Sequence, residues 1–408
     1  MRRVLTTFDV TCIGVNAIVG SGIYLFPGKL QAALGPVSIL AWLLTGLLCL
    51  PLAFCFAALG SIEERSGASF RYAQVAFGTG VAFVVGWSAW VTSVISWAAV
   101  ASGIPRYLGT LDPGLAQGGA ARAIGAAVII AFGTLNVVGV KPGARLTDAL
   151  TLGKLVPLAI FVVVGLFAWH GERFQPITTQ SFTALPAMLL MTMFAYQGFE
   201  VVGVPAGEVR DPQRSIPIGV LVSMLGAALL YALVQIVFVG VGGRATHAPL
   251  PDAARAFLGP AGAGLLAAGG VISMLGFNAG TALCTPRYLQ ALAEERLVPP
   301  GLARAHPRFD TPALAITVST LVAAALSLVL DFERLVDLAV LAVLGQYLAS
   351  SAALVRLARR PRERLLGLLS VVISIGFGLQ STAAEAVRLA ALMALGLLVV
   401  LATRAIWK

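Results

Sequence analysis

The sequence predicts an all-α membrane protein. Apolar residues make up 58% of the 408 residues and charged residues only 11%, whereas soluble domains carry about 25% charged residues. Apolar runs of roughly 20 residues, enough to cross a hydrocarbon core of ~30 Å, recur along the whole chain. These runs are continuously apolar rather than alternating, which excludes transmembrane β-strands. In lipid each crossing must satisfy its own backbone, so the spans are expected to be helices.

Twelve helical spans follow from the apolar runs, joined by short connections. We expect them at 8–31, 38–60, 79–104, 119–139, 146–169, 185–208, 216–241, 262–291, 313–331, 334–356, 364–380 and 383–403. The longest polar stretches, 62–78, 292–312 and 357–364, then lie on the same side of the membrane. Asp9 interrupts the first apolar segment, and no small-residue cleavage site follows it. A cleaved signal peptide is therefore not expected.

The placement of Lys and Arg predicts the orientation. With the N-terminus inside, 19 basic residues fall on the cytoplasmic side and eight outside, while Lys154 lies within a span. The inner set includes the cluster Arg356, Arg359, Arg360, Arg362 and Arg364. Because cytoplasmic loops carry an excess of Lys and Arg, both termini are expected in the cytoplasm of a cell-membrane protein. The net charge of +10 thus reflects topology, and nucleic acid is not an expected partner.

Two spans contain small residues in mid-membrane. The first reads Asn16-Ala-Ile-Val-Gly-Ser-Gly-Ile-Tyr24, and the sixth reads Phe194-Ala-Tyr-Gln-Gly-Phe-Glu-Val-Val-Gly203. A pair of glycine-interrupted segments at corresponding places in two halves of a chain indicates the binding site of a secondary transporter. The alternative is a small-residue surface for helix packing, which is common in membranes.

The first break offers groups for both ends of an amino acid. Gly20 and Gly22 flank Ser21 and favour unwinding of the helix. Unwinding frees the amides of Ser21, Gly22 and Ile23 at the start of a new half-helix, where the helix dipole favours a carboxylate. It also frees carbonyls near Ile18, which suit an ammonium group.

The second break is expected at Gln197 and Gly198. Free carbonyls of Phe194, Ala195 and Gln197 are candidates to complete an ammonium site. The rings of Phe194 and Tyr196 are candidates to cover the substrate side chain, although both residue types are also ordinary packing residues.

Lys154 and Glu200 are the informative charges inside predicted spans, where burial of a charge is costly and suggests function. Lys154 is a candidate to brace span one against span eight and to carry a coupled proton. The alternative is an interfacial lysine that extends to the headgroups. Glu200 follows the second break, and we favour a structural role there over cation or proton binding. Few other acidic residues lie in the predicted core, which favours neutral substrates.

Enzymatic chemistry has little support in the sequence. Four cysteines, Cys12, Cys49, Cys55 and Cys284, lie inside apolar runs without metal-site or disulfide spacing. His170, His247 and His306 fall in separate loops. No metal cluster, nucleophile–base pair or phosphate loop stands out, so neither catalysis nor a cofactor is expected.

With these motifs and two further stretches, the whole chain resembles the amino acid–polyamine–organocation (APC) superfamily of permeases. The further stretches are Glu208…Asp211-Pro212…Ile216-Pro217 and Arg287…Glu294-Glu295-Arg296-Leu297-Val298-Pro299. The resemblance implies a five-plus-five inverted repeat over 8–169 and 185–356, with accessory helices in 364–403 and discontinuous first and sixth helices.

By the same resemblance, a substrate carboxylate meets Ser21, Gly22 and Ile23, and its ammonium group meets the carbonyls of Ile18, Phe194 and Gln197. Lys154 matches the span-five lysine of sodium-independent members. The chain departs from the family at Glu64-Arg65-Ser66-Gly67-Ala68-Ser69-Phe70-Arg71-Tyr72, where members often have Pro-x-Ser-Gly-Gly-x-Tyr. It also has Ala58 where an acidic residue is usual.

The expected function is secondary active transport of amino acids, neutral ones favoured, by proton symport or substrate exchange with alternating access. The expected partners are a small amino acid, the lipid bilayer and, in symport, protons, with no obligate protein partner. Two alternatives remain: a polyamine or cationic amino acid transporter or antiporter, and an amino acid sensor that does not transport.

Overall fold

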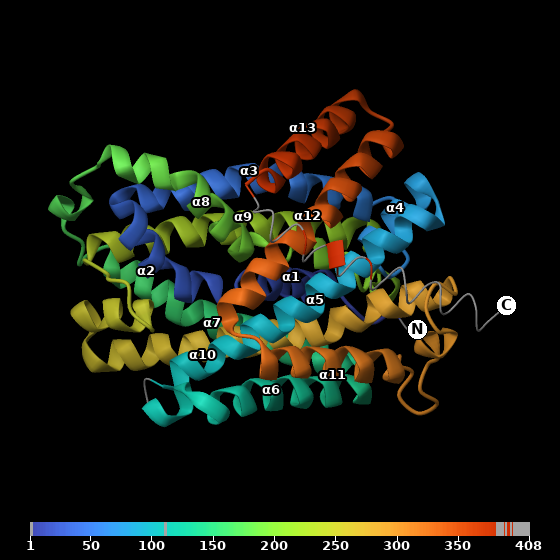
Figure 1. Cartoon of the computed structure of the whole chain (residues 1–408), viewed down its shortest axis with the longest axis horizontal. Coiled ribbons are helices and arrows are strands. Elements are labelled where there is room, and N and C mark those ends of the chain that lie inside the picture. The colour runs from blue at the N-terminus through green and yellow to red at the C-terminus, as the bar shows by residue number, and fades with distance from the viewer. Residues whose placement is uncertain (1–2, 110–111, 381–386, 388–389, 392–393, 395–408) are drawn as a thin grey trace.

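The computed structural model describes residues 3–109, 112–380, 387, 390, 391 and 394, and within them regular structure is helical apart from one isolated bridge between Leu5 and Val209. The α-helices are α1 (Thr7–Ile18), α2 (Gly22–Leu34), α3 (Ser38–Gly60), α4 (Ser69–Phe77), α5 (Thr79–Leu108), α6 (Gly118–Val138), α7 (Val140–Gly165), α8 (Thr179–Tyr196), α9 (Pro212–Gly240), α10 (Pro249–Glu294), α11 (Ala313–Val329), α12 (Phe332–Leu357) and α13 (Pro361–Gly378). Figure 1 shows most of them running along one common direction.

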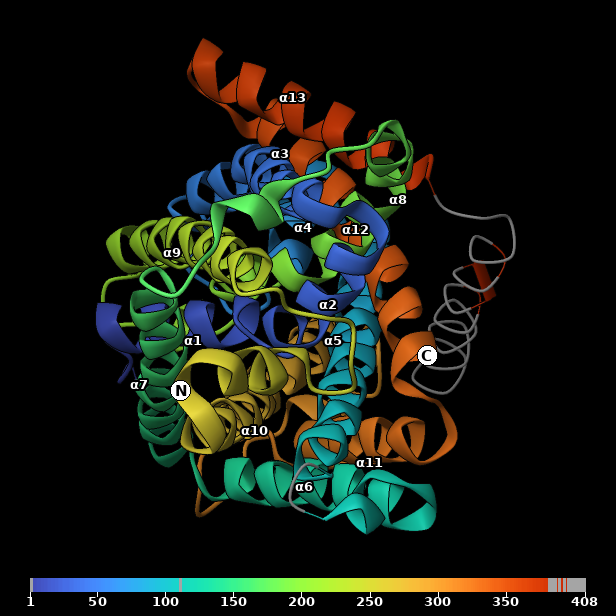
Figure 2. The same ribbon diagram turned by 90° about the vertical axis from the view of Figure 1, so that its left-hand side faces the viewer.

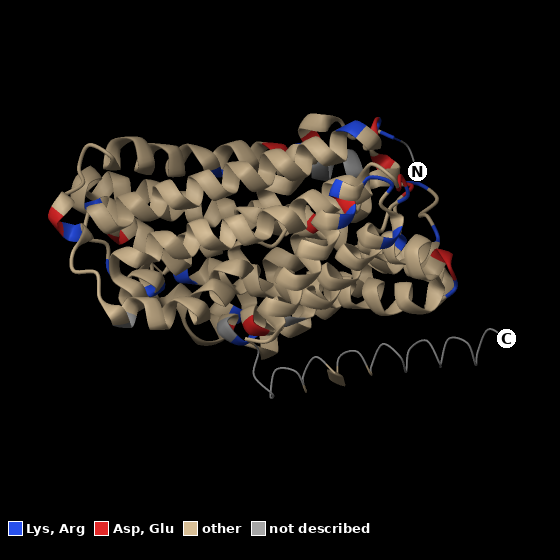
Figure 3. Cartoon of the chain, turned by 90° about the horizontal axis from the view of Figure 1, so that it is seen from above, with Lys and Arg blue, Asp and Glu red and all other residues tan. Residues whose placement is uncertain are grey.

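The first eleven predicted spans each fall on helical residues, and the twelfth, 383–403, lies almost wholly outside the described residues. By length and composition, eight stretches of the described chain can cross a membrane, and Ala313–Val329 is a shorter apolar helix. Most charged residues gather toward the two ends of the helices (Figure 3). This distribution leaves a belt with few charges between the two ends, as a membrane-embedded protein requires.

Helix bounds differ from the sequence prediction at several places, including a polar stretch and the start of the eighth predicted span. The polar stretch 62–78, predicted as a connection, contains helix α4, which buries Phe70, Tyr72 and Ala73 against its neighbours. The helix predicted at 262–291 begins instead at Pro249, and it kinks at Gly259, whose φ is 67°. Pro260 follows directly, and a proline ring does not accommodate a regular preceding turn. The kink separates an outer segment from the long membrane helix.

Helices that are five predicted spans apart pack against each other. Helix α2 packs on α8, α3 on α9, α5 on α10 and α6 on α11. Figure 2 shows two of these pairs, α3 with α9 at one side of the molecule and α6 with α11 at the other. The broken helices α1–α2 and α8 lie between these outer layers, so that α5 and α10 face both breaks.

Candidate functional site

The break predicted at Gly20-Ser21-Gly22 is present between α1 and α2. Helix α1 ends at Ile18, Val19 leaves helical geometry with ψ at 78°, and α2 begins at Gly22. A Cβ atom on Gly22 would lie 2.5 Å from the Cβ of Ala195 in α8. Glycine therefore allows the end of α8 to approach the start of α2.

The amides at the start of α2 are unsatisfied. Among the hydrogen bonds of the described residues, the N–H groups of Ser21, Gly22 and Ile23 have no acceptor. The first N–H groups of a helix lack intrahelical partners and carry its positive end, so they bind anions. These are the amides expected from the sequence to meet a carboxylate.

The second break follows Tyr196, where α8 ends. Gly198 has a φ of 129°, and a Cβ there would lie 2.4 Å from the carbonyl carbon of Ala17 and 2.7 Å from the nitrogen of Ile18. Only glycine fits this contact between the two broken helices. One carboxylate oxygen of Glu200 accepts hydrogen bonds from the Gly198 N–H at 2.8 Å and the Tyr347 hydroxyl at 2.8 Å. Glu200 thus holds the unwound backbone, the role favoured from the sequence.

A cavity of about 50 Å³ lies between the two breaks, α5 and α10. This is room for a few water molecules or a small ligand group. Three buried polar atoms on its wall have no partner within the described chain: Ser21 Oγ, Gln197 Nε2 and Thr285 Oγ1. The remaining predicted residues on the wall are Ile18, Gly20, Gly22, Phe194, Ala195, Gly198 and Glu200. Because buried polar groups normally find a partner, the three atoms are available to water or to a polar ligand in the cavity.

The wall opposite the breaks was not predicted from the sequence. It is formed by small hydroxyl and thiol side chains on α5 and α10: Thr92, Ser93, Ser96, Thr281, Cys284 and Thr285. In sequence they are indistinguishable from the small polar residues that mediate helix packing in membranes.

Two predicted residues do not line this cavity. The Tyr196 hydroxyl donates to the Trp42 carbonyl at 2.9 Å, and its ring packs against Trp42 and Tyr231. The prediction that this ring covers the substrate is therefore wrong for this geometry, because the side chain points into the α3–α9 packing. The Ile23 side chain is also buried away from the cavity wall, and only its amide faces the break.

Tyr231 in α9 joins the two broken helices, and the sequence did not single it out. Its hydroxyl lies 2.7 Å from the Ile18 carbonyl and 2.9 Å from the Ala195 carbonyl, the ends of α1 and α8. The one available signal is that a tyrosine in an apolar span needs a partner for its hydroxyl.

Lys154 in α7 is fully buried, which excludes the interfacial alternative. Its ammonium group donates to the Val19 carbonyl at 2.6 Å and to the Asn16 carbonyl at 3.4 Å. Ser273 of α10 donates to the Val19 and Gly20 carbonyls at 3.0 and 3.1 Å. The end of α1 is thus held by α7 and α10, as predicted for spans five and eight.

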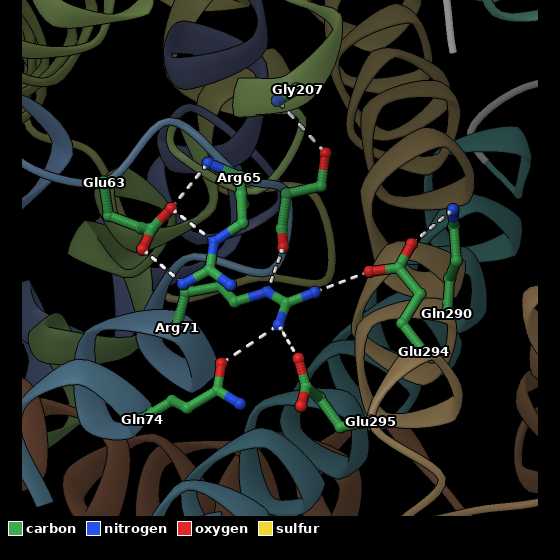
Figure 4. A network of polar contacts seen from close by, with 9 residues as sticks. Glu63, Arg65, Arg71, Gln74, Gly207, Gln290, Glu294 and Glu295 are labelled. Atoms are coloured by element: carbon green, nitrogen blue, oxygen red, sulfur yellow. Dashed lines mark hydrogen bonds and ion pairs between the residues drawn. The ribbon is translucent and has the colours of Figure 1, made fainter. Parts of the chain in front are cut away.

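The stretch that departs from the family pattern forms a polar network with the C-terminal end of α10 (Figure 4). Arg71 is 3% exposed and contacts Glu294 at 2.5 Å and Glu295 at 2.6 Å. Partial burial opposes ionisation of Glu295, but the hydrogen bond from Arg71 prevails and holds its pKa below the usual value. Deeper in, Arg287 and Glu208 form a fully buried pair at 3.3 Å. These contacts tie helix α4 and the segment that contains Glu208 to the C-terminal part of α10.

Comparison with known proteins identifies the family. A family model described as amino acid permease matches residues 5–404. The chain is 28% identical over 381 residues to the methylthioribose transporter of Bacillus subtilis, which covers 89% of this chain and 83% of that protein. It is 27% identical to the serine/threonine exchanger SteT of the same species, over 87% of this chain and 83% of that one. It is 24% identical to the branched-chain amino acid permease BcaP, over 88% and 82%. The chain belongs to the amino acid permease family of the APC superfamily.

Proposed function

We propose that this permease is a sodium-independent secondary transporter of small neutral amino acids, working by proton symport or substrate exchange. We further propose twelve spans with both termini in the cytoplasm, and a five-plus-five inverted repeat over 8–169 and 185–356 followed by accessory helices in 364–403. The packing of helices five spans apart supports the repeat. The relatives, which include amino acid permeases and exchangers, support amino acid transport.

The arrangement of the two breaks is the observation that carries the proposal. Free amides at the start of α2 provide a positive site for a carboxylate. Across the cavity, the carbonyl ends of α1 and α8 provide a negative site for an ammonium group. The site therefore complements a zwitterion with backbone groups, as expected from Ile18, Gly20, Ser21, Gly22, Ile23, Phe194, Ala195, Gln197 and Gly198.

The walls support a small neutral side chain. Hydroxyl groups of α5 and α10 face the breaks, and the Thr285 hydroxyl is without a partner in the described chain. Glu200 is the carboxylate on the described wall, and its Oε2 already accepts two hydrogen bonds. With this one carboxylate, already tied to the unwound backbone, the described wall offers little negative charge for a second ammonium group, which favours neutral substrates over polyamines and cationic amino acids.

Lys154 supports sodium independence. Its ammonium group contacts the carbonyls at the end of α1, so the charge of a coupling cation is already supplied by the protein. Loss of its proton would weaken the hold of α7 on α1, which would couple protonation to movement of the broken helix. Substrate exchange needs no such step, and both modes are compatible with this geometry.

Uptake by the purified protein in liposomes tests the proposal. We expect sodium-independent uptake of labelled serine, threonine or alanine, stimulated either by an inward proton gradient or by internal amino acid. A requirement for sodium, or uptake of polyamines in preference to amino acids, would contradict it. Methylthioribose is the informative competitor, because a relative transports it and it lacks a carboxylate. Substrate binding without flux in any gradient would instead support a sensor.

A further inference from the structure

A cleft on the outside of the bundle lies apart from the cavity between the breaks. It has a volume of about 520 Å³ and lies between the end of α3, the start of α9 and the start of α13. Figure 1 shows α13 projecting outward beside α3 and α12. The walls are Phe54, Ala57, Ala58 and Ser61 on the α3 side, Pro217 of α9, and Arg362, Glu363 and Leu366 of α13.

The lining of the cleft changes from polar to apolar along its length. Ser61 and Arg362 lie at its polar end. Phe54 lies seven residues before Ser61, which is about 10 Å deeper along the helix. Phe54 is 41% exposed, and Ala57, Ala58 and Leu366 continue the apolar part of the wall. A polar end that continues into an exposed apolar groove matches the headgroup and acyl chain of a lipid.

Arg362 and three arginines next to it in the chain have no carboxylate partner among the described residues. Arg359, Arg360, Arg362 and Arg364 are exposed, and no ion pair or side-chain hydrogen bond joins any of them to the described residues. Other arginines of the described chain, in contrast, are paired. Carboxylates contact Arg3, Arg65, Arg71 and Arg287. Within the four-arginine segment, Glu363 is the single acidic residue. Counting the described residues, the arginines next to the cleft therefore carry more positive charge than Glu363 balances.

We propose that this cleft binds a phospholipid with a net anionic headgroup. Arginine side chains pair with phosphate oxygens in bidentate geometry, and basic residues beside a membrane helix attract anionic lipids. The phosphate lies against Arg362 and its basic neighbours, and one acyl chain lies along Phe54, Ala58 and Leu366. Positive-inside topology accounts for basic residues at this end of a helix but requires neither a cleft nor a lipid of particular charge.

Native mass spectrometry of the detergent-purified full chain tests the site, independently of transport. Phosphatidylglycerol and phosphatidylcholine with the same acyl chains are titrated separately. We expect retention of one phosphatidylglycerol, and at least about tenfold weaker binding of phosphatidylcholine. Millimolar inorganic phosphate is expected to leave the lipid bound. Equal binding of both lipids, or displacement by phosphate alone, would overturn the proposal in favour of nonspecific lipid or a free-anion site.

Matched variants separate the site from general electrostatics. The combined change Arg359→Gln, Arg360→Gln, Arg362→Gln and Arg364→Gln is expected to weaken phosphatidylglycerol binding at least about tenfold. The control removes the same charge from four other exposed arginines through Arg122→Gln, Arg244→Gln, Arg255→Gln and Arg334→Gln, and is expected to stay within about twofold of the parent. Equal losses in the two variants would overturn the site.

A third variant fills the cleft without changing charge. Ala58→Trp places an indole on its wall and is expected to reduce phosphatidylglycerol binding as strongly as loss of the arginines does. A gel-filtration profile equal to that of the parent shows that each variant is folded. If the folded Ala58→Trp protein retains the lipid with parental affinity, the acyl chain does not lie in this cleft.

Discussion

Replacing Tyr231 by Phe removes one hydroxyl from the junction of the two broken helices. That hydroxyl is within hydrogen-bond distance of the Ile18 and Ala195 carbonyls. The ring itself packs against Trp42 at 4.8 Å and Tyr196 at 5.1 Å between centroids, and phenylalanine keeps these contacts. The substitution therefore changes the hydrogen bonding of the junction without changing its packing volume.

Loss of the Tyr231 hydroxyl affects the two carbonyls unequally. Ile18 still accepts a hydrogen bond from the Gly20 N–H at 2.9 Å, whereas Ala195 keeps no donor among the described residues. One buried carbonyl left without a partner costs about 1–3 kcal/mol. If that cost falls only on the conformation described here, its population relative to the other conformations of the transport cycle drops about 5- to 150-fold. We expect transport efficiency to fall within that range.

Initial rates of amino acid uptake into liposomes, normalised to inserted protein, measure the effect. Tyr107→Phe is the matched control, because its hydroxyl donates to the Tyr24 carbonyl at 2.7 Å within a continuous helix rather than at a break. We expect this control to change uptake by less than about threefold. Uptake by Tyr231→Phe within twofold of the parent, or an equal loss in both variants, would refute the reasoning.

Three further substitutions test other parts of the junction. Gly198→Ala is expected to abolish uptake, because its Cβ would meet the backbone of α1 at 2.4 Å, while Gly226→Ala, with no atom within 4 Å, keeps parental uptake. Lys154→Met is expected to remove the response of uptake to a proton gradient; an unchanged response would contradict a coupling role. Arg287→Met leaves the carboxylate of Glu208 buried and unpaired, so we expect thermal unfolding to show a loss of about 3–5 kcal/mol. The double variant that also carries Glu208→Gln should recover most of this lost stability.

The two breaks were predictable because their signals are local. Gly22 and Gly198 lack the Cβ atoms that would clash at the contact between the broken helices, and small residues in apolar runs are visible in the sequence. Lys154 was predictable for the same reason, since a single charge inside an apolar run needs a partner. The carbonyls that accept from Lys154 were also predictable, because the break frees them from the helix. Their distances from its ammonium group were not predictable.

Features that depend on helix rotation were not predictable. Tyr196 is adjacent to the break, yet its direction is set by the packing of α8 against α3 and α9. Tyr231 gains its role from carbonyls that lie 213 and 36 residues away in sequence. Helix α4 was missed because its short apolar face lies within a polar stretch, where length and hydropathy indicate only a connection.

The hydrogen bonds of the junction are distributed unequally between its positive and negative halves, and this leads to a last prediction. On the carbonyl side, Tyr231, Lys154 and Ser273 already donate to the ends of α1 and α8. On the amide side, the N–H groups of Ser21 and Gly22 have no acceptor within the described chain. Substrate binding should thus depend more on the carboxylate, which satisfies empty donors, than on the ammonium group, which shares occupied acceptors.

We expect glycerate, which lacks the amine of serine, to compete measurably for uptake, and serinamide, which lacks the carboxylate, to compete at least about tenfold less well. Stronger competition by serinamide would show that the carbonyl half of the site dominates recognition.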